Sequence, residues 1–246
     1  MIASAIHMDD VHKQFAGTEV LRGLSLDVPA SSIFALVGAN GAGKTTCLKT
    51  LLDFVEADAG TISLFGNDHR NSTSRARVAF LPERFLPPHH LTGFEFLDYM
   101  ARLHDRQVNR ESAVETASRL DLDPTALHRS ARSYSKGMSQ KLGLAACLMS
   151  GKELLVLDEP MDGLDPKARL LVKRVMNDLR GHGRGVFFST HVLADVQAVC
   201  DQLAILHQGK VRFCGSVESC LARYGGEDLE QAYLNCIDDD EPAARG

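Results

Sequence analysis

The stretch Ile33-Phe34-Ala35-Leu36-Val37-Gly38-Ala39-Asn40-Gly41-Ala42-Gly43-Lys44-Thr45-Thr46 decides the fold of this chain. Its leading apolar residues predict a buried strand, its glycine-rich middle predicts a loop, and the residues from Lys44 predict the first turn of a helix. The spacing Gly38-x-x-x-x-Gly43-Lys44-Thr45 fits a phosphate-binding loop at every specified position. A glycine-rich turn that happens to precede a helix is the alternative, but the apolar strand before the loop favours phosphate binding.

The residue types in this loop suit a nucleotide. Glycines let the backbone curl until successive N–H groups face one anion, and the following helix adds the positive end of its dipole. Lys44 can bring a positive charge to the β- and γ-phosphates, and the Thr45 hydroxyl is a ligand for Mg²⁺. We therefore expect a nucleotide and Mg²⁺ at this loop, with the phosphates held by Gly38, Ala39, Asn40, Gly41, Ala42, Gly43, Lys44, Thr45 and Thr46.

Length and composition restrict the class of protein. A chain of 246 residues that is 44% hydrophobic forms one large domain or two small ones with a sizeable core. The net charge of −5 argues against a protein that coats nucleic acid, so we expect no nucleic-acid partner. No apolar run approaches the roughly 20 residues that span a bilayer, and the first residues lack the pattern of a signal peptide. We expect a cytoplasmic protein whose six cysteines are free thiols, several of them buried.

Strand and helix signals alternate along the chain, which predicts an α/β fold. Alternating apolar residues in Val20–Val28 indicate antiparallel strands before the glycine loop. Between residues 86 and 150 helical periods dominate, and Thr92 with Glu95 forms a capping-box pattern. The other expected elements are strands at 61–65, 78–81, 154–157 and 186–190, helices at 44–54, 110–120, from 139 and from Pro166, a hairpin over 203–213, and a helical end that leads into a solvated acidic tail at Asp238–Glu241.

Two adjacent carboxylates follow the short apolar run Leu154–Leu157. Asp158 comes at the strand end, where its carboxylate can hold Mg²⁺ directly or through water. Glu159 is suited to orient or deprotonate an attacking water. An ordinary boundary between a strand and a turn is the alternative. Charges at the edge of a buried strand are costly, however, unless a cation or hydrogen bonds use them.

The segment Tyr134-Ser135-Lys136-Gly137-Met138 precedes a predicted helix, which Ser135 can cap. With the glycine loop and the two carboxylates, it makes residues 5–215 resemble the ATP-binding subunits of ABC transporters. Gly38–Thr45 matches the family's Walker A motif, Leu154–Glu159 its Walker B motif, Tyr134–Met138 its signature, Gly163–Asp165 its D-loop, His191 its switch histidine, and Phe15 the aromatic that stacks on adenine. Simple core packing is the alternative for Phe15, and an ordinary core or surface histidine for His191.

The resemblance implies a fold class and a division of the chain. The class is α/β, with a P-loop NTPase (RecA-like) core, an N-terminal antiparallel β subdomain and an inserted α-helical subdomain. The implied segments are 1–85 for the β subdomain and first part of the core, 86–148 for the helical subdomain, 149–215 for the second part of the core, and 216–246 for a C-terminal helical and acidic extension.

The resemblance also implies a mechanism. Two such subunits pair head to tail, so that each ATP lies between the Walker A loop of one and the signature of the other. The implied catalytic residues are Lys44, Glu159 and His191, and the implied ligands of Mg²⁺ are Thr45, Glu83 and Asp158. Besides the glycine loop, the residues implied to contact the nucleotide or its metal are Phe15, Glu83, Ser135, Gly137 and Asp158.

The signature departs from the family's usual Leu-Ser-Gly-Gly-Gln. Lys136 and Met138 replace a glycine and the glutamine, whereas the phosphate-facing Ser135 and Gly137 remain. We therefore expect the signature to keep its function. Lys136 even adds a charge of the sign that a phosphate attracts.

Two further positions differ from the family pattern. Glu83 stands where the Q-loop has glutamine, and its carboxylate still offers an oxygen to Mg²⁺. A solvent-exposed turn glutamate is the alternative. Asp162 replaces a serine that is common beside the D-loop. Glu83 and the Tyr-Ser-Lys-Gly-Met form resemble the subfamily that serves ABC-2 type exporters.

The resemblance predicts a subunit that couples ATP hydrolysis to an integral membrane permease, with a second copy of the chain as its nucleotide-binding partner. It would lie on the inner face of the cell membrane, and the permease would dock near the Glu83 loop and the Phe94–Met100 helix. One alternative is a soluble ABC-class ATPase of DNA repair or translation, whose coiled coils or tandem units do not fit in 246 residues. The other is an ATP-binding regulator without turnover, which Lys44, Asp158, Glu159 and His191 together disfavour.

Overall fold

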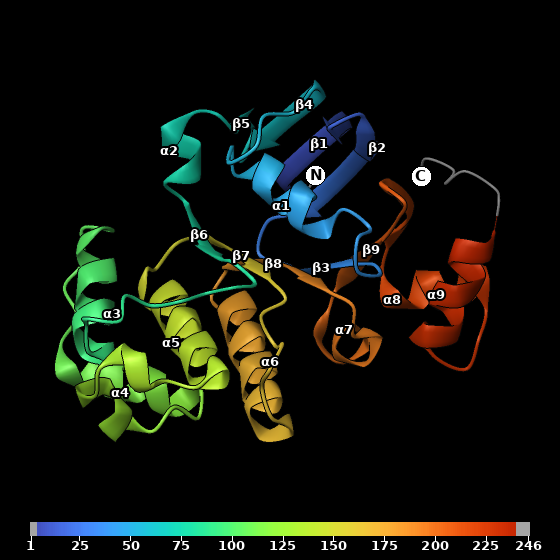
Figure 1. Ribbon diagram of the computed structural model, residues 1–246. Coiled ribbons are helices and arrows are strands. Elements are labelled where there is room, and N and C mark those ends of the chain that lie inside the picture. Colours follow the sequence, from blue (N-terminus) through green and yellow to red (C-terminus); the bar gives the residue numbers. More distant parts are fainter. Residues whose placement is uncertain (1–3, 240–246) are drawn as a thin grey trace.

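The computed structural model describes residues 4–239, and within this range the strands form two sheets (Figure 1). The first sheet is antiparallel, in the order β2-β1-β4-β5. Its strands are β1 (Ser4–Phe15), β2 (Thr18–Pro29), β4 (Ala59–Leu64) and β5 (Asn67–Asp68). Buried and exposed residues alternate along much of β1 and β2, so one face of this sheet packs against the core. The prediction of antiparallel strands before the glycine loop is confirmed.

The second sheet crosses the middle of the molecule, and in the described residues its order is β10-β9-β3-β8-β7-β6. Its strands pair in parallel except for β10, which forms the predicted hairpin with β9. Every residue of β3, β7 and β8 is buried, because other elements cover both faces of the sheet. The strand bounds are β3 (Ile33–Val37), β6 (Val78–Leu81), β7 (Leu154–Asp158), β8 (Gly185–Thr190), β9 (Gln202–His207) and β10 (Lys210–Gly215).

Helix α1 (Lys44–Leu51) lies between the two sheets (Figure 1). Its buried face joins a hydrophobic cluster that contains Phe34 of β3 and Phe187 of β8. These two rings pack edge to face, with 5.9 Å between their centroids and 65° between their planes. The helix is shorter than the expected 44–54, because the chain turns after Leu51 and Asp53 takes the left-handed conformation, with φ of 61°.

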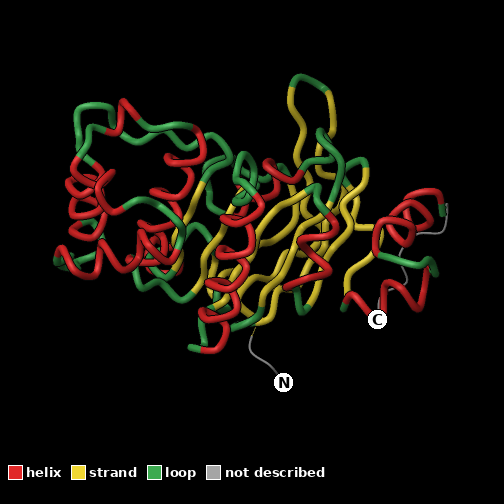
Figure 2. Tube along the Cα trace, turned by 90° about the horizontal axis from the view of Figure 1, so that it is seen from below, coloured by secondary structure: helices red, strands yellow, loops and turns green. Residues whose placement is uncertain are grey.

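Helices α3 (Gly93–Arg102), α4 (Arg110–Arg119) and α5 (Lys136–Met149) form a block at one end of the molecule, on the left in Figures 1 and 2. The capping box of α3 is confirmed: the Glu95 N–H donates to the Thr92 hydroxyl and the Thr92 N–H donates to the Glu95 carboxylate. Helix α5 begins before the expected residue 139, since the Ser135 hydroxyl accepts from the Met138 N–H at 3.2 Å and caps the helix at that point. The short 3₁₀ turns η1 (Pro124–His128) and η2 (Ala131–Ser133) connect α4 to α5.

Two helices cover the face of the central sheet opposite α1, namely α6 (Pro166–Gly181) and α7 (Leu193–Val199). Helices α8 (Val217–Tyr224) and α9 (Leu229–Asp238) pack at the far end, beside β10 and α7. The sequence did not predict α2 (Ser72–Arg75) or α7, which are too short to show a helical period. Of the expected acidic tail, Asp238 ends α9, whereas Asp240 and Glu241 lie outside the described residues.

All six cysteines fall within the described range and are free thiols, as expected. Cys47, in α1, is buried against the sulfur of Met8, and burial raises the pKa of its thiol to about 12. Cys147, Cys220 and Cys236 are also buried. Among residues 4–239, no helix is both long enough and apolar enough to cross a membrane.

Removal of the Phe187 ring should destabilise the whole fold. The side chain is fully buried in the contact with Phe34, so Phe187→Ala should lower the free energy of unfolding by about 3–5 kcal/mol. Urea denaturation followed by circular dichroism measures this loss. The matched control is Phe54→Ala, whose ring is 64% exposed and should cost no more than about 1.5 kcal/mol for its contact with Phe80. Equal losses in the two variants would contradict this assignment of the core.

Candidate nucleotide-binding site

The predicted functional residues gather where neighbouring parallel strands end. The glycine loop follows β3, Glu83 follows β6, Glu159 follows β7 and His191 follows β8. The register aligns these ends, because Val37 pairs with Thr190 and Asp158 pairs with Ser189. In open parallel sheets the carboxyl edge is the usual place for a ligand.

The glycine loop has a backbone that only glycine allows at several points. A Cβ atom at Gly38 would lie 2.4 Å from the carbonyl oxygen of Leu206, so the strand could not leave the sheet there with any larger residue. Gly41 and Gly43 have φ of 83° and 109°, in the left-handed region. Helix α1 begins at Lys44 without a side-chain cap, so its first N–H groups point outward without an acceptor from the helix. This arrangement is a cradle for an anion.

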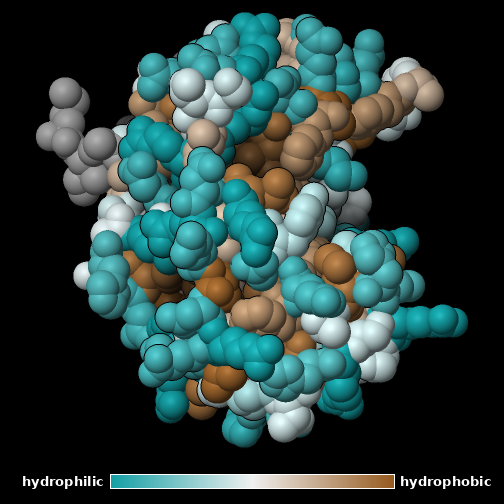
Figure 3. Space-filling view, turned by 90° about the vertical axis from the view of Figure 1, so that its left-hand side faces the viewer, coloured by the Kyte–Doolittle hydropathy of each residue, from teal (hydrophilic) through white to brown (hydrophobic). Residues whose placement is uncertain are grey.

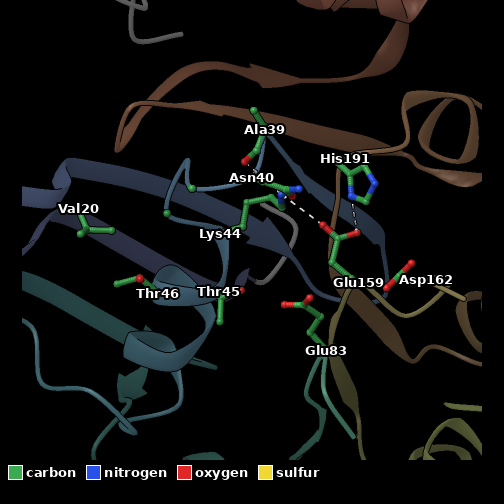
Figure 4. A pocket seen from close by; sticks show the side chains of 12 residues that line it. Val20, Ala39, Asn40, Lys44, Thr45, Thr46, Glu83, Glu159, Asp162 and His191 are labelled. Atoms are coloured by element: carbon green, nitrogen blue, oxygen red, sulfur yellow. Dashed lines mark hydrogen bonds and ion pairs between the residues drawn. The ribbon is translucent and has the colours of Figure 1, made fainter. Parts of the chain in front are cut away.

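The loop forms one wall of a cavity of about 620 Å³ (Figure 4). Glu83 points into it from below, and Glu159 and His191 close the opposite side. The lining residues are Val20, Ala39, Asn40, Gly41, Gly43, Lys44, Thr45, Thr46, Glu83, Glu159, Asp162 and His191. The cavity therefore brings together ten of the residues that the sequence analysis assigned to ATP, Mg²⁺ or catalysis.

Lys44 lies at the bottom of this cavity and is almost completely buried, with 6% of its surface exposed. Its ammonium donates to the carbonyl oxygen of Gly38 at 2.7 Å and forms an ion pair with Glu159 at 3.2 Å. A buried ammonium is costly unless it is paired and hydrogen-bonded. Lys44 has both kinds of partner, and its charge points into the cavity (Figure 4).

Glu159 is held between two basic side chains. One carboxylate oxygen contacts Lys44, and the other lies 3.1 Å from Nδ1 of His191, whose side chain is 47% exposed. The Glu159 backbone has φ of 47°, in the left-handed region that residues other than glycine seldom adopt. The left-handed turn directs the carboxylate into the cavity rather than along the strand (Figure 4).

Ser189 fixes both acidic residues, and the sequence analysis did not identify it. Its hydroxyl accepts from the Glu159 N–H at 3.0 Å and donates to Oδ1 of Asp158. Asp158 is 2% exposed and is not one of the residues that line the cavity. Only the pairing of β7 with β8 identifies Ser189 as a functional residue, because this pairing sets it opposite Asp158.

The structure does not bring every predicted residue to the cavity. Phe15 lies at the turn between β1 and β2, 45% exposed, with the ammonium of Lys13 at 5.4 Å from its ring centroid. Ser135 and Gly137 lie at the start of α5, outside the lining of this chain's own cavity. The cavity also contains Val20, which the sequence gave no reason to select.

The side chains at this edge fit a metal that takes most of its ligands from phosphate and water. Within residues 4–239, no group of three or more His, Cys, Asp and Glu side chains can hold a metal ion by itself. Thr45 and Glu83 both line the cavity, and Asp158 directly precedes Glu159 of its wall. Mg²⁺ is commonly bound by one or two protein oxygens together with substrate phosphates, which matches this sparse set of donors.

Comparisons with known proteins agree on one family. A family model described as ABC transporter matches residues 21–162. An uncharacterized ABC transporter ATP-binding protein of Synechocystis sp. is 38% identical over 214 residues, which cover 86% of this chain and 60% of that protein. The bacitracin transport ATP-binding protein BcrA of Enterococcus faecalis is 36% identical over 211 residues, covering 83% of this chain and 67% of that protein.

A solved structure supports the same fold. The ATP binding subunit of an ABC transporter superposes with a TM-score of 0.83 at 28% identity, over 95% of this chain and 99% of that one. The predicted fold class, a P-loop NTPase core joined to an antiparallel sheet and an inserted set of helices, is confirmed. The chain spans only 60% and 61% of the length of the two cyanobacterial relatives that it matches.

Loss of the Ser189 hydroxyl should weaken the site and the fold together. Ser189→Ala leaves the buried Glu159 N–H without an acceptor, so we expect a loss of about 1–3 kcal/mol in unfolding free energy and weaker binding of ATP·Mg²⁺. Chemical denaturation and titration with a fluorescent ATP analogue measure the two effects. Ser150→Ala is the control, because Ser150 is equally buried and bonds the Cys147 carbonyl, away from the cavity. If both variants bound ATP·Mg²⁺ alike, Ser189 would have no special role.

Proposed function

The chain belongs to the ABC transporter family of ATP-binding proteins, and on this premise we propose that it binds and hydrolyses ATP to drive a separate membrane permease. One observation carries the proposal: Lys44, Glu159 and His191 form a continuous chain of contacts, 3.2 Å and 3.1 Å long, along one cavity. A glycine loop alone would serve any nucleotide-binding protein. A carboxylate and an imidazole beside it supply the groups that cleavage of a γ-phosphate requires.

We propose that the loop holds the phosphates through its backbone N–H groups and Lys44. A triphosphate carries more negative charge than one carboxylate, so it draws the Lys44 ammonium away from Glu159. Bound there, Mg²⁺ would neutralise part of the negative charge of the phosphates. Its proposed ligands are Thr45 and Glu83 in the cavity wall and the oxygen of Asp158 that Ser189 leaves free.

The Glu159 carboxylate released by Lys44 can then serve the attacking water. We propose that it orients this water and accepts its proton, while His191 holds Glu159 in place and contacts the γ-phosphate. The water oxygen forms a bond to phosphorus as the bond to the bridging oxygen breaks. ADP takes the electron pair of that bond, and inorganic phosphate leaves.

The proposed partner for nucleotide binding is a second copy of this chain, arranged head to tail. Ser135 caps α5 and Gly137 lies in its first turn, and neither residue lines this chain's own cavity, so both are available to the nucleotide of the other copy. The N-terminus of α5 would supply N–H groups and positive potential to that γ-phosphate. In this arrangement Phe15, exposed at its turn, stacks on the adenine of the same chain's nucleotide. ATP then holds the dimer together and hydrolysis releases it.

The proposed membrane partner docks on the helical block. Apolar areas are set among hydrophilic ones on this side of the molecule (Figure 3), and Leu86, Tyr99 and Leu103 are 76%, 52% and 59% exposed. Leu86 follows Glu83 closely in the chain, so docking at this segment would change the position of Glu83 in the cavity wall. We propose an export-type permease and a position on the inner face of the cell membrane. The relative from Enterococcus is named for bacitracin transport, which favours transport over a role in repair or translation.

Glu159→Gln should separate ATP binding from turnover. The amide keeps the size of the carboxylate but cannot accept a proton, so we expect retained ATP binding, hydrolysis slowed by about 100-fold or more, and an ATP-bound dimer that persists. Phosphate release and size-exclusion chromatography with ATP·Mg²⁺ measure these effects. Glu111→Gln, an exposed substitution at the start of α4, should behave as the parent protein. Unchanged turnover in Glu159→Gln would remove Glu159 from its role.

A crosslinker at Tyr99 should identify the docking face. A photoreactive residue there, at 52% exposure, should couple the chain to an integral membrane protein in membranes of the source cell. The control position is Leu234 in α9, which is 49% exposed at the opposite end of the molecule. Coupling to a membrane protein from position 234 alone would refute docking on the helical block.

A further inference from the structure

Two departures from the family pattern turn out to be partners. The ammonium of Lys136 lies 2.6 Å from a carboxylate oxygen of Asp162. Lys136 is the first residue of α5, and Asp162 lies in the loop after β7 that continues into Gly163. The sequence presents them as separate replacements, 26 positions apart, whereas the fold joins them in one ion pair.

Each of these charges is unfavourable without the other. A lysine in the first turn of a helix is repelled by the positive end of the helix dipole. Asp162 lines the nucleotide cavity, where a carboxylate repels phosphate. The pairing offsets both effects, and the Lys136 ammonium holds the pKa of Asp162 below its usual value.

The backbones of the two segments also approach closely, in addition to the charged groups of Lys136 and Asp162. Gly163 has φ of 72°, and a Cβ atom there would lie 3.2 Å from Cδ of Lys136. A Cβ atom on Gly137 would lie 3.2 Å from the carbonyl oxygen of Gly163. The lysine stem therefore lies across the loop. Lys136 remains 66% exposed and Asp162 40% exposed, so a ligand from outside can reach the pair.

In the proposed dimer, the two residues of this pair lie at different nucleotide-binding sites. Asp162 lines the cavity of its own chain, whereas Lys136 lies between Ser135 and Gly137, which are offered to the nucleotide of the second copy. A phosphate that approaches the start of α5 meets the Lys136 ammonium first. It must compete with Asp162 for that charge.

We propose that Asp162 is a positioning residue that holds Lys136 in an ion pair. When the dimer closes, the triphosphate bound by the second copy replaces Asp162 as the partner of the Lys136 ammonium. This inference rests on the proposed head-to-tail dimer. Closure leaves Asp162 unpaired in its own cavity, so the occupancy of one nucleotide site changes the charge that lines the other. The Lys136–Asp162 pair thereby links the two sites of the dimer.

The test is a double-mutant cycle in the Glu159→Gln background, in which we expect hydrolysis to be slower by about 100-fold or more. Dimer formation is measured by sedimentation velocity during titration with ATP·Mg²⁺. Asp162→Asn should free Lys136 for the nucleotide. Dimerisation should then tighten about two- to fivefold, which corresponds to the free energy of an exposed ion pair. Lys136→Gln should weaken dimerisation, and Lys136→Arg should restore it. In the Lys136→Gln background, Asp162→Asn should tighten dimerisation by less than it does in the parent, because only the repulsion between the Asp162 carboxylate and the phosphates of its own cavity is then removed.

Two results would overturn the inference. If Asp162→Asn tightens dimerisation equally without Lys136, the carboxylate acts on its own nucleotide directly. If Asp162→Asn weakens dimerisation, the pair only stabilises the fold. The control is Lys167→Gln, which breaks a similarly exposed pair with Asp121 at 2.5 Å, away from the cavity, and should leave dimerisation unchanged.

The parent Glu159→Gln protein separates this inference from the proposed function. If the parent itself fails to dimerise with ATP·Mg²⁺, the head-to-tail arrangement is wrong and the inference is overturned with it. If the parent dimerises and the cycle is additive, the proposed function stands and the role of the Lys136–Asp162 pair is refuted. Binding of a fluorescent ATP analogue to dilute, monomeric protein shows whether any variant has lost its own nucleotide site.

Discussion

The ion pair between Lys44 and Glu159 is the contact on which the site depends. Both side chains are nearly buried, so each charge would be costly there without a partner. They come from the ends of β3 and β7, which lie on either side of β8, so the pair exists only if these strands are in register. Ser189, at the end of β8, then bonds the acidic residues. The contacts in the cavity therefore depend on the strand order of the central sheet.

Much of this architecture was predictable because its signals are local. A continuous apolar run such as Ile33–Val37 has few alternatives to a buried strand, and the capping box at Thr92 needs only residues of its own helix. The spacing of the glycine loop predicts where a phosphate would bind. The other parts depended on tertiary neighbours. Val20 and Ser189 carry no motif, and α7 is too short to show a period.

Lys136 and Asp162 illustrate a different limit of the sequence. Each residue, taken alone, weakens a motif, and together they compensate for one another across the contact between α5 and the loop after β7. A motif is therefore better judged with its spatial neighbours than position by position. Asp121 makes the same point, since it binds both Lys141 of α5 and Lys167 of α6 and ties the helical block to the core.

The path of the chain between β6 and β7 has a consequence for how such proteins diversify. These strands are neighbours in the sheet, with Leu81 opposite Leu157, although residues 82–153 intervene. The whole intervening segment therefore begins and ends at adjacent strands. The pairing of β6 with β7 does not depend on the length of this segment. Recombination at these two junctions would exchange the helical module together with Glu83 and Ser135 while leaving β3, β7 and β8 in register, so the surface offered to the proposed membrane partner and this part of the site would change as one unit.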